Sequence, residues 1–540
     1  MERDLARRSD PPAVEGTISQ DRTRLAFWVL VLLTAVSVAL GVYMRISILG
    51  GGSLWLDELW TLDAVSRSFR EMVGARLVSD QSPPLWTALT WVWLQVAGTY
   101  DTSTMRILPA LFGTIAIVAP LIGAAKMRAL RPTLLVMASI MALSLFALQY
   151  SVEMRPYSMM IALGTVATVI WAGLLTAQVP RTGLWIFLFA LTGALAGFAH
   201  YYGNLLYVGE SAVLLVLLAR ERLWRPVLLH VGWGAVSVIP VVAWYIFTRP
   251  WARNEAVAAP PSIAEIQTWS AYVVAPIPNV ISGSPLGYPG VLTGLGLVLP
   301  GVAAVAIVGS LVADRVLGRA SHGTQAVTLV LMCSAIVLVA GLGTAWLASV
   351  LMPPSMNTRN LAALLPVTLL AIAAACTLPR SDGLRWVTAS GTVGVWLVAV
   401  VLLLAQYGVA VLAPPWQQGA AYRTVSQLLL ASANDTDPPT LIGLDTPWDW
   451  HGQWDAAIRA ETRADPAIST DPLGLPITWV GGVDGAAALQ VPDGPLIVFS
   501  DSYDQRATDL FAWAMAERGP CELATYGGPG FGAVDLLRCG

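Results

Sequence analysis

The sequence predicts a polytopic α-helical membrane protein of about eleven transmembrane helices, followed by a small C-terminal extracytoplasmic α/β domain. Of its 540 residues, 56% are hydrophobic and only 12% are charged, and the mean hydropathy is +0.64. One water-soluble core could not bury this much apolar surface, so a soluble enzyme and a disordered chain are both excluded. The formal net charge of −3 offers no basic surface to a nucleic acid, which excludes nucleic-acid binding.

Runs of about 18 or more apolar residues mark the expected spans. The first run follows a polar tail, residues 1–25. Its arginines predict a cytoplasmic location, and its polar composition predicts disorder. This run is too long for a signal peptide, so we expect it to remain as a membrane anchor. The expected spans are 26–47, 105–125, 132–150, 157–177, 182–199, 204–219, 226–247, 289–313, 324–351, 360–377 and 386–411.

Residues 83–98 decide the topology, because counting them as a span would reverse every later loop. The stretch is short, opens with two prolines and contains three tryptophans, which favours a helix lying at the membrane interface. If it does not cross, the inner segments hold sixteen basic residues and the outer loops seven, as the positive-inside rule requires. We therefore predict a first outer loop at 48–104 and a multi-pass protein of the bacterial cell (inner) membrane.

This topology places residues 412–540 on the outer side of the cell membrane, after a transmembrane domain at 26–411. Short β-like runs at 440–445 and 495–501 alternate there with helical patterns at 417–433 and 504–518, which predicts a small α/β domain. Cys521 and Cys539 flank a glycine-rich segment typical of a hairpin. They are expected to form a disulfide if this domain lies in an oxidising compartment.

Polar side chains from five separate stretches gather on the expected outer face. Each stretch alone fits an ordinary role: solvated loop acids, a local ion pair that ends a helix, or interfacial aromatic anchors. Their occurrence together favours a site, because the inner loops carry mainly arginine. The stretches contain Trp55, Asp57 and Glu58; Asp80; Glu153, Arg155 and Tyr157; His200, Tyr201 and Tyr202; and Asn357 with Arg359.

The motifs Leu54-Trp-Leu-Asp-Glu58, Asp80-x-x-Pro-Pro-Leu85 and Glu153-x-Arg-Pro-Tyr157 resemble those of GT-C superfamily glycosyltransferases. These polytopic enzymes use polyprenyl-phosphate-linked sugars, and the superfamily includes protein O-mannosyltransferases, aminoarabinose transferases and actinobacterial cell-envelope enzymes. The resemblance implies that Asp57 lies at the catalytic centre with Glu58 and Asp80 in support, and that transfer proceeds by single displacement with inversion. Only Arg359 matches the late motif of the superfamily, because Asn360 stands where an aromatic residue is usual.

Residue chemistry assigns further roles within this hypothesis. Asp57 is the expected general base, and Arg155 is the expected clamp on the departing phosphate, with Arg359 and His200 next. The remaining predicted substrate-binding residues offer a carboxylate and aromatic faces for sugar rings and the isoprenoid: Glu153, Tyr157, Tyr201, Tyr202 and Trp55.

No cofactor is required by this chemistry and no metal site is assigned, although Asp57, Glu58 and Asp80 could hold a divalent cation through oxygen ligands. One lysine among 31 basic residues is typical of a GC-rich bacterial genome, which favours a polyprenyl-phosphate donor of mannose or arabinofuranose. The expected partners are this donor, the lipid bilayer and a glycan, lipid or protein acceptor of the cell envelope. A transporter or flippase of envelope precursors and a non-catalytic scaffold are the alternatives. A transporter should carry charges at mid-depth in its spans, but these positions are nearly free of charge, and Glu210 is the one clear exception.

Overall fold

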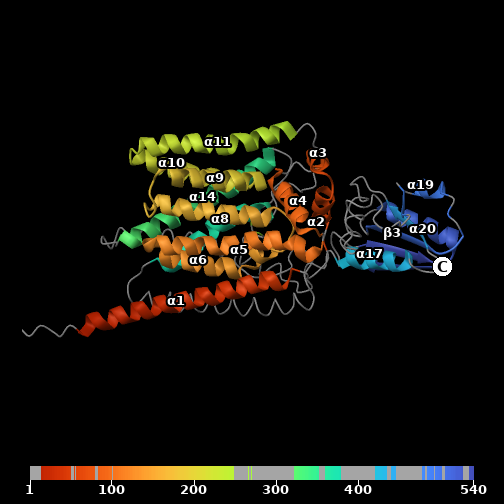
Figure 1. Ribbon diagram of the computed structural model, residues 1–540, viewed down its shortest axis with the longest axis horizontal. Coiled ribbons are helices and arrows are strands. Elements are labelled where there is room, and N and C mark those ends of the chain that lie inside the picture. The colour runs from red at the N-terminus through yellow and green to blue at the C-terminus, as the bar shows by residue number, and fades with distance from the viewer. Residues whose placement is uncertain are drawn as a thin grey trace, which may run out of the picture.

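The apolar part of the chain forms a bundle of helices that run alongside one another, and the C-terminal α/β part lies at one end of it (Figure 1). Three short helices lie at that same end: α2 (Leu56–Val65), α3 (Phe69–Ser79) and α4 (Leu85–Ala97). The computed structural model describes residues 14–49, 54, 56–79, 83–99, 101–248, 266, 269, 322–351, 359–378, 420–433, 439–444, 477–480, 483–489, 491, 493–501, 505–526 and 534–540.

Within the described residues, seven helices are long and apolar enough to cross a membrane. Each coincides with a span expected from the sequence, and α9 (Gly183–Ala199) matches a further one but is shorter. The expected spans 289–313 and 386–411 lie outside the described residues, so the count of eleven stays a prediction. The seven are α1 (Val14–Ser47), α5 (Thr102–Lys126), α8 (Tyr157–Leu175), α10 (Gly203–Arg220), α11 (Trp224–Thr248), α14 (His322–Leu351), and η3 (Asn360–Leu364) continued by α15 (Leu365–Thr377).

Apolar side chains face outward along the bundle. Leu32 on α1 and Leu228 and Ile239 on α11 are exposed, as are other large hydrophobic residues of these helices. Such wide apolar surfaces are not stable in water but match the hydrocarbon of a bilayer. The chain is therefore a multi-pass membrane protein.

The helix α4 is not among those long enough to cross, in agreement with the sequence prediction. Its 13 residues end at Gly98, which adopts the left-handed conformation with φ of 64°. Trp86 is buried against Phe112, and the indole N–H of Trp93 donates to the Thr104 carbonyl. These tryptophans thus fix α4 to the protein rather than only to the membrane interface.

The expected span 132–150 consists of two helices instead of one: α6 (Arg131–Leu143), preceded by η1 (Arg128–Leu130), and α7 (Leu145–Tyr150). Ser144 between them has extended backbone, and its hydroxyl accepts a hydrogen bond from the Ala147 N–H, which caps α7. The guanidinium of buried Arg45 donates to the carbonyls of Met141 and Ala142 and so satisfies the end of α6.

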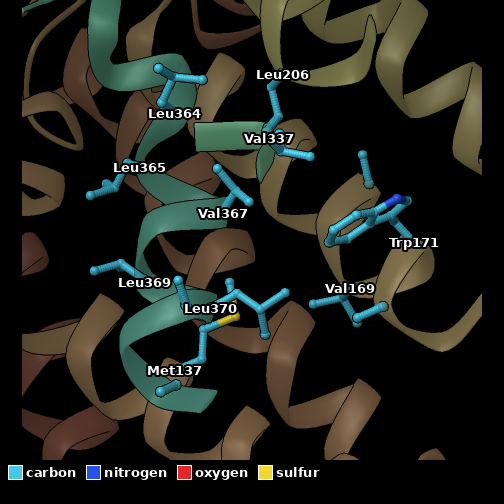
Figure 2. Close-up of a cluster of buried hydrophobic side chains, with 14 of the residues drawn as sticks. Met137, Val169, Trp171, Leu206, Val337, Leu364, Leu365, Val367, Leu369 and Leu370 are labelled. Atoms are coloured by element: carbon cyan, nitrogen blue, oxygen red, sulfur yellow. The ribbon is translucent and has the colours of Figure 1, made fainter. Parts of the chain in front are cut away.

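The helix α8 forms the packed centre of the bundle and contacts α5, α9, α10, α14 and α15. It is apolar on all sides, which is typical of a helix surrounded by other helices. Figure 2 shows Val169 and Trp171 of α8 in one buried cluster with Leu370 of α15, and this cluster also includes Leu206 and Val337. This packing gives a rigid support to the segment 151–156, which enters α8.

The C-terminal part is the predicted α/β domain. Its sheet has the strand order β2-β1-β3-β5-β4, in which the first three strands are parallel and the last two pairings are antiparallel. One buried apolar cluster contains residues of this domain and of α2. Its members include Val425 and Phe499 of the domain and Leu59 of α2. The elements are α17 (Ala420–Ala433), β1 (Thr440–Leu444), β2 (Ile477–Val480), α19 (Val483–Ala487), β3 (Leu496–Asp501), α20 (Gln505–Arg518), β4 (Cys521–Tyr526) and β5 (Val534–Cys539).

A disulfide joins Cys521 to Cys539 across the antiparallel strands β4 and β5. Replacing both cysteines by serine is expected to lower the free energy of unfolding of this domain by about 2–4 kcal/mol, because a cross-link restricts the unfolded chain. Hydrogen exchange of the β5 amides in the full chain measures the loss. A reductant should have the same effect on the natural chain and none on the double variant; equal exchange with and without reductant would contradict the prediction.

Candidate active site

Two neighbouring acids open α2. Asp57 and Glu58 lie in its first turn, where the N-terminal end of the helix dipole favours negative charge. Consecutive helical residues point about 100° apart, so the two carboxylates face different surroundings. The Asp57 side chain is 17% exposed, whereas that of Glu58 is fully buried.

Glu58 forms a buried ion pair with Arg106 of α5. Its Oε1 accepts from Nε of Arg106 at 3.2 Å and from the backbone N–H of Met154 at 2.8 Å, and its Oε2 accepts from Nη2 of Arg106 at 2.9 Å. Both oxygens are therefore engaged, and the pair ties α2, α5 and the segment 151–156 together. These contacts give Glu58 a positioning role, and its predicted catalytic role stays a prediction.

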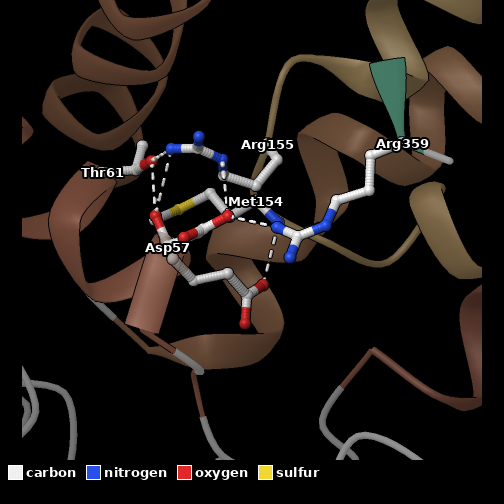
Figure 3. A network of polar contacts seen from close by, with 6 residues as sticks. Asp57, Thr61, Met154, Arg155 and Arg359 are labelled. Carbon is white, nitrogen blue, oxygen red and sulfur yellow. Dashed lines mark hydrogen bonds and ion pairs between the residues drawn. The ribbon is translucent and has the colours of Figure 1, made fainter. Parts of the chain in front are cut away.

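Asp57 lies between two guanidinium groups (Figure 3). Nη1 of Arg359 is 2.6 Å from Asp57 Oδ2, and Nε of Arg155 is 3.8 Å from the same oxygen. Nη1 of Arg155 also donates to the Asp57 carbonyl and the Thr61 hydroxyl, each at 3.3 Å. Burial lowers the pKa of Arg359, and the nearby Asp57 raises it, followed by Tyr157 and Glu153, with a net rise that keeps the group charged.

Glu153 is the third acid of the site and lies in the segment between α7 and α8. The residue is 7% exposed, and its Oε1 has no hydrogen-bond partner among the described residues. Burial raises the pKa of this carboxyl to about 8, opposed by the charge of Arg359 and assisted by that of Glu58. At neutral pH Glu153 is therefore mostly protonated.

The predicted aromatic residues divide into two groups. The His200 ring lies 5.6 Å from that of Tyr157 and 5.9 Å from that of Tyr202, so these three rings are neighbours. Tyr201 points instead toward α11, where its ring meets that of Tyr245 at 5.4 Å. The predicted role of His200 in phosphate binding stays a prediction.

Two predicted site residues, Trp55 and Asp80, lie outside the described residues. The structure adds Arg106, Thr61 and Arg45, which were not among the predicted site residues. Arg45 is fully buried and donates from Nε to the Ser151 hydroxyl at 3.0 Å. An arginine within an apolar span was the available signal for both Arg45 and Arg106, because such a charge is stable only with partners.

The charge balance at Asp57 favours an anion. Arg155 and Arg359 carry two positive charges against the one negative charge of Asp57, while Glu58 and Arg106 neutralise each other. A divalent cation at Asp57 would meet both guanidinium groups, so the described residues fit a cation poorly. No group of three potential metal ligands is found in the part of the chain that the structure describes, and Asp80, the third carboxylate proposed for a cation, lies outside it.

The fold and the site define a polytopic helical membrane protein with acids and arginines gathered at one end of its bundle. No family model matches the sequence, and no curated protein sequence matches it either.

Several solved structures are similar in overall fold. ArnT from Cupriavidus metallidurans in the apo state is 14% identical, with a TM-score of 0.44 over 95% of this chain and 98% of that one. AglB from Archaeoglobus fulgidus, an oligosaccharyltransferase in complex with an inhibitory peptide and a dolichol-phosphate, is 12% identical, with a TM-score of 0.41 over 90% of this chain and 71% of that one. The A. fulgidus oligosaccharyltransferase in complex with Zn and sulfate is 11% identical, with a TM-score of 0.45 over 92% and 73%. These similarities assign no residue of this chain a role.

Proposed function

We propose that the chain is a membrane glycosyltransferase that moves a sugar from a polyprenyl-phosphate donor to a hydroxyl of a cell-envelope glycan, lipid or protein. The observation that carries this proposal is the convergence of Arg155 and Arg359 on Asp57 at one end of an apolar helical bundle. A site of this kind provides positive charge to bind the donor phosphate, a carboxylate to act as base, and a position from which the donor can enter from the bilayer.

The two arginines suit the phosphate of the donor. A sugar phosphodiester carries one negative charge, which the excess positive charge at Asp57 would balance. When the bond between the sugar and the phosphate oxygen breaks, negative charge grows on the departing phosphate. Guanidinium groups already fixed in place stabilise that charge without reorganisation.

Asp57 provides the base for the acceptor. An oxygen of its carboxylate takes the proton of the acceptor hydroxyl, whose oxygen bonds to the anomeric carbon as the bond to phosphate breaks. The donor phosphate would draw Arg359 and Arg155 partly away from Asp57, which makes the carboxylate a better proton acceptor in the donor complex. One displacement of this kind inverts the anomeric centre.

The surroundings suit the other parts of the donor. The rings of Tyr157, His200 and Tyr202 offer faces for the sugar, and the exposed apolar helices offer a lipid environment for the prenyl chain. Mannose and arabinofuranose are the proposed sugars. We place the site and the C-terminal domain on the extracytoplasmic side of the bacterial cell membrane, with no cofactor required and a divalent cation as the less favoured alternative.

A transporter is the second candidate function, and one buried acidic residue supports it. Glu210 of α10 is fully buried; its Oε1 accepts from the Thr168 hydroxyl at 2.6 Å, and its Oε2 has no partner among the described residues. A lone carboxyl within a span is a feature of transport pathways. The acids and arginines at the end of the bundle, however, have no evident role in transport.

Replacing Arg359 by methionine is expected to raise the half-saturating donor concentration tenfold to a hundredfold, on the order expected for one charged hydrogen bond. The assay uses the full chain in vesicles with decaprenyl-phosphate carrying radiolabelled mannose or arabinofuranose, and bacterial membranes as the source of acceptor. Label transferred to acceptor and released decaprenyl phosphate are both measured.

The matched control is Arg67→Met. Arg67 forms an exposed ion pair with Asp63, one helical turn away on α2, so its loss should leave transfer unchanged. Absence of transfer from both donors by the natural chain, together with movement of intact donor across the vesicle membrane, would favour the transporter and contradict the proposed function.

A further inference from the structure

Glu153 differs from the other two acids of the site in having no ion-pair partner at hydrogen-bond distance among the described residues. Glu58 has both oxygens occupied by Arg106 and Met154, and Asp57 is held by Arg359. Glu153 is more than nine-tenths buried, yet its Oε1 accepts no hydrogen bond within the described chain. A buried polar atom of this kind is costly unless it serves a bound partner.

The position of Glu153 brings it close to the reacting groups. It lies two residues before Arg155, and its electrostatic neighbours are Arg359 ahead of η3, Asp57 and Glu58 on α2, and Tyr157 at the start of α8. Met154, the next residue, is fixed by its hydrogen bond to Glu58, so the backbone that carries Glu153 is held in place. The carboxyl therefore lies near the two arginines of the proposed phosphate clamp.

The surroundings favour the protonated form of this carboxyl. Burial is the largest cause of its raised pKa, about 8; Arg359 and Arg155 act against it, and Glu58 and Asp57 act with it. At pH 7 the protonated form is then in about tenfold excess. A neutral carboxyl donates a hydrogen bond, which neither Asp57 nor Glu58 can do as a carboxylate.

We propose that Glu153 is the proton donor to the departing lipid phosphate, acting opposite the base Asp57. This inference rests on the proposed function and goes beyond it by adding a second proton-carrying group. The site would then neutralise the leaving group by a proton as well as by the two guanidinium groups.

The protons and bonds of this step balance. The bond between the anomeric carbon and the phosphate oxygen breaks, and its electron pair stays on that oxygen, which receives the proton of Glu153. The acceptor oxygen bonds to the anomeric carbon and loses its proton to Asp57. After the products leave, the proton of Asp57 passes to the Glu153 carboxylate, and both groups return to their starting states without an added reactant.

Glu153→Gln is the test variant, because glutamine keeps the size and a hydrogen-bond donor but has no proton to transfer. We expect kcat to fall by about 10²–10⁴-fold with little change in the half-saturating donor concentration. In the natural chain, kcat should decline as pH rises through about 8, because the donor form of Glu153 is lost. This alkaline decline should be absent from the residual activity of the variant.

The control variant is Glu221→Gln, which removes an acid that pairs with Arg181 at the opposite end of α10. Infrared difference spectroscopy gives a readout besides activity. A protonated-carboxyl band present at pH 7 and lost above pH 8 is expected in the natural chain and in Glu221→Gln, and is expected to be missing in Glu153→Gln. If the glutamine variant does not fold, the proton-donor role is tested by the carboxyl band and the alkaline decline of kcat in the natural chain and in Glu153→Asp.

The outcomes separate the two proposals. Normal transfer by the natural chain together with a kcat of Glu153→Gln near that of Glu221→Gln would overturn the proton-donor role and leave the proposed function standing. No transfer by the natural chain from either radiolabelled donor would overturn the proposed function, and the proton-donor role with it. A natural chain that transfers sugar without an alkaline decline or a titrating carboxyl band would also overturn the role of Glu153.

Discussion

Asp57→Asn is expected to lower sugar transfer at least about a hundredfold while the amount of protein in the membrane is unchanged. Asparagine has nearly the size of aspartate and can still accept a hydrogen bond from Arg359, so the local packing should persist. It cannot take the proton of the acceptor hydroxyl at neutral pH. The loss should therefore appear in kcat, and the donor should bind at least as well as in the natural chain, since the two guanidinium groups no longer face a negative charge at position 57.

The measurement uses the vesicle assay with decaprenyl-phosphate-linked mannose or arabinofuranose, and donor binding is followed separately by retention of label on the purified chain. Asp63→Asn is the control, because Asp63 lies on the same helix and pairs with Arg67 at a partly exposed position. A transporter or a scaffold predicts little change for either variant. Equal transfer by Asp57→Asn and Asp63→Asn would remove the carboxylate base from the mechanism.

Much of the fold could be predicted because the bilayer imposes strong rules on a sequence. Apolar runs located the long helices, and the number of arginines in the loops indicated that 83–98 does not cross. The break at Ser144 was not visible in the same way. Hydropathy averages over a window, whereas the break depends on one serine cap and on the hydrogen bonds that Arg45 donates to the end of α6.

Asp57, Glu153, Arg155 and Arg359 were predictable as site residues from the sequence, and the structure brings these four together. The pairing inside the group was beyond the sequence, because a motif gives residue types without directions. From the sequence alone, the adjacent acidic residues Asp57 and Glu58 cannot be assigned different partners. Their different partners arise only when α2 turns one toward Arg359 and the other toward α5.

In the C-terminal domain, the β-like runs and the disulfide were visible in the sequence. The strand order could not be predicted, because it depends on which strands pair with each other across long separations in the sequence. The parallel addition of β2 outside β1 and the antiparallel addition of β5 beside β3 involve contacts between distant segments. Local sequence patterns do not indicate which strands pair.

Arg106→Met is expected to lower the free energy of unfolding by about 3–5 kcal/mol, because it leaves the Glu58 carboxylate buried without its counter-ion. Both partners are almost completely buried, at 4% and 0% exposure of the side chains, so water cannot take the place of the guanidinium. The segment 151–156 should loosen as well, since Glu58 holds the Met154 N–H. Thermal and denaturant unfolding of the full chain in detergent measures the loss.

The double variant Glu58→Gln/Arg106→Met tests this cause. The Oε1 of glutamine can still accept the Met154 N–H, but no charge remains buried, so most of the lost stability should return. Sugar transfer should recover with it if the role of Glu58 is to position Arg155, and should stay low if the Glu58 carboxylate itself takes part in the chemistry. A double variant no more stable than Arg106→Met alone would show that the unpaired Glu58 carboxylate is not the cause of the lost stability.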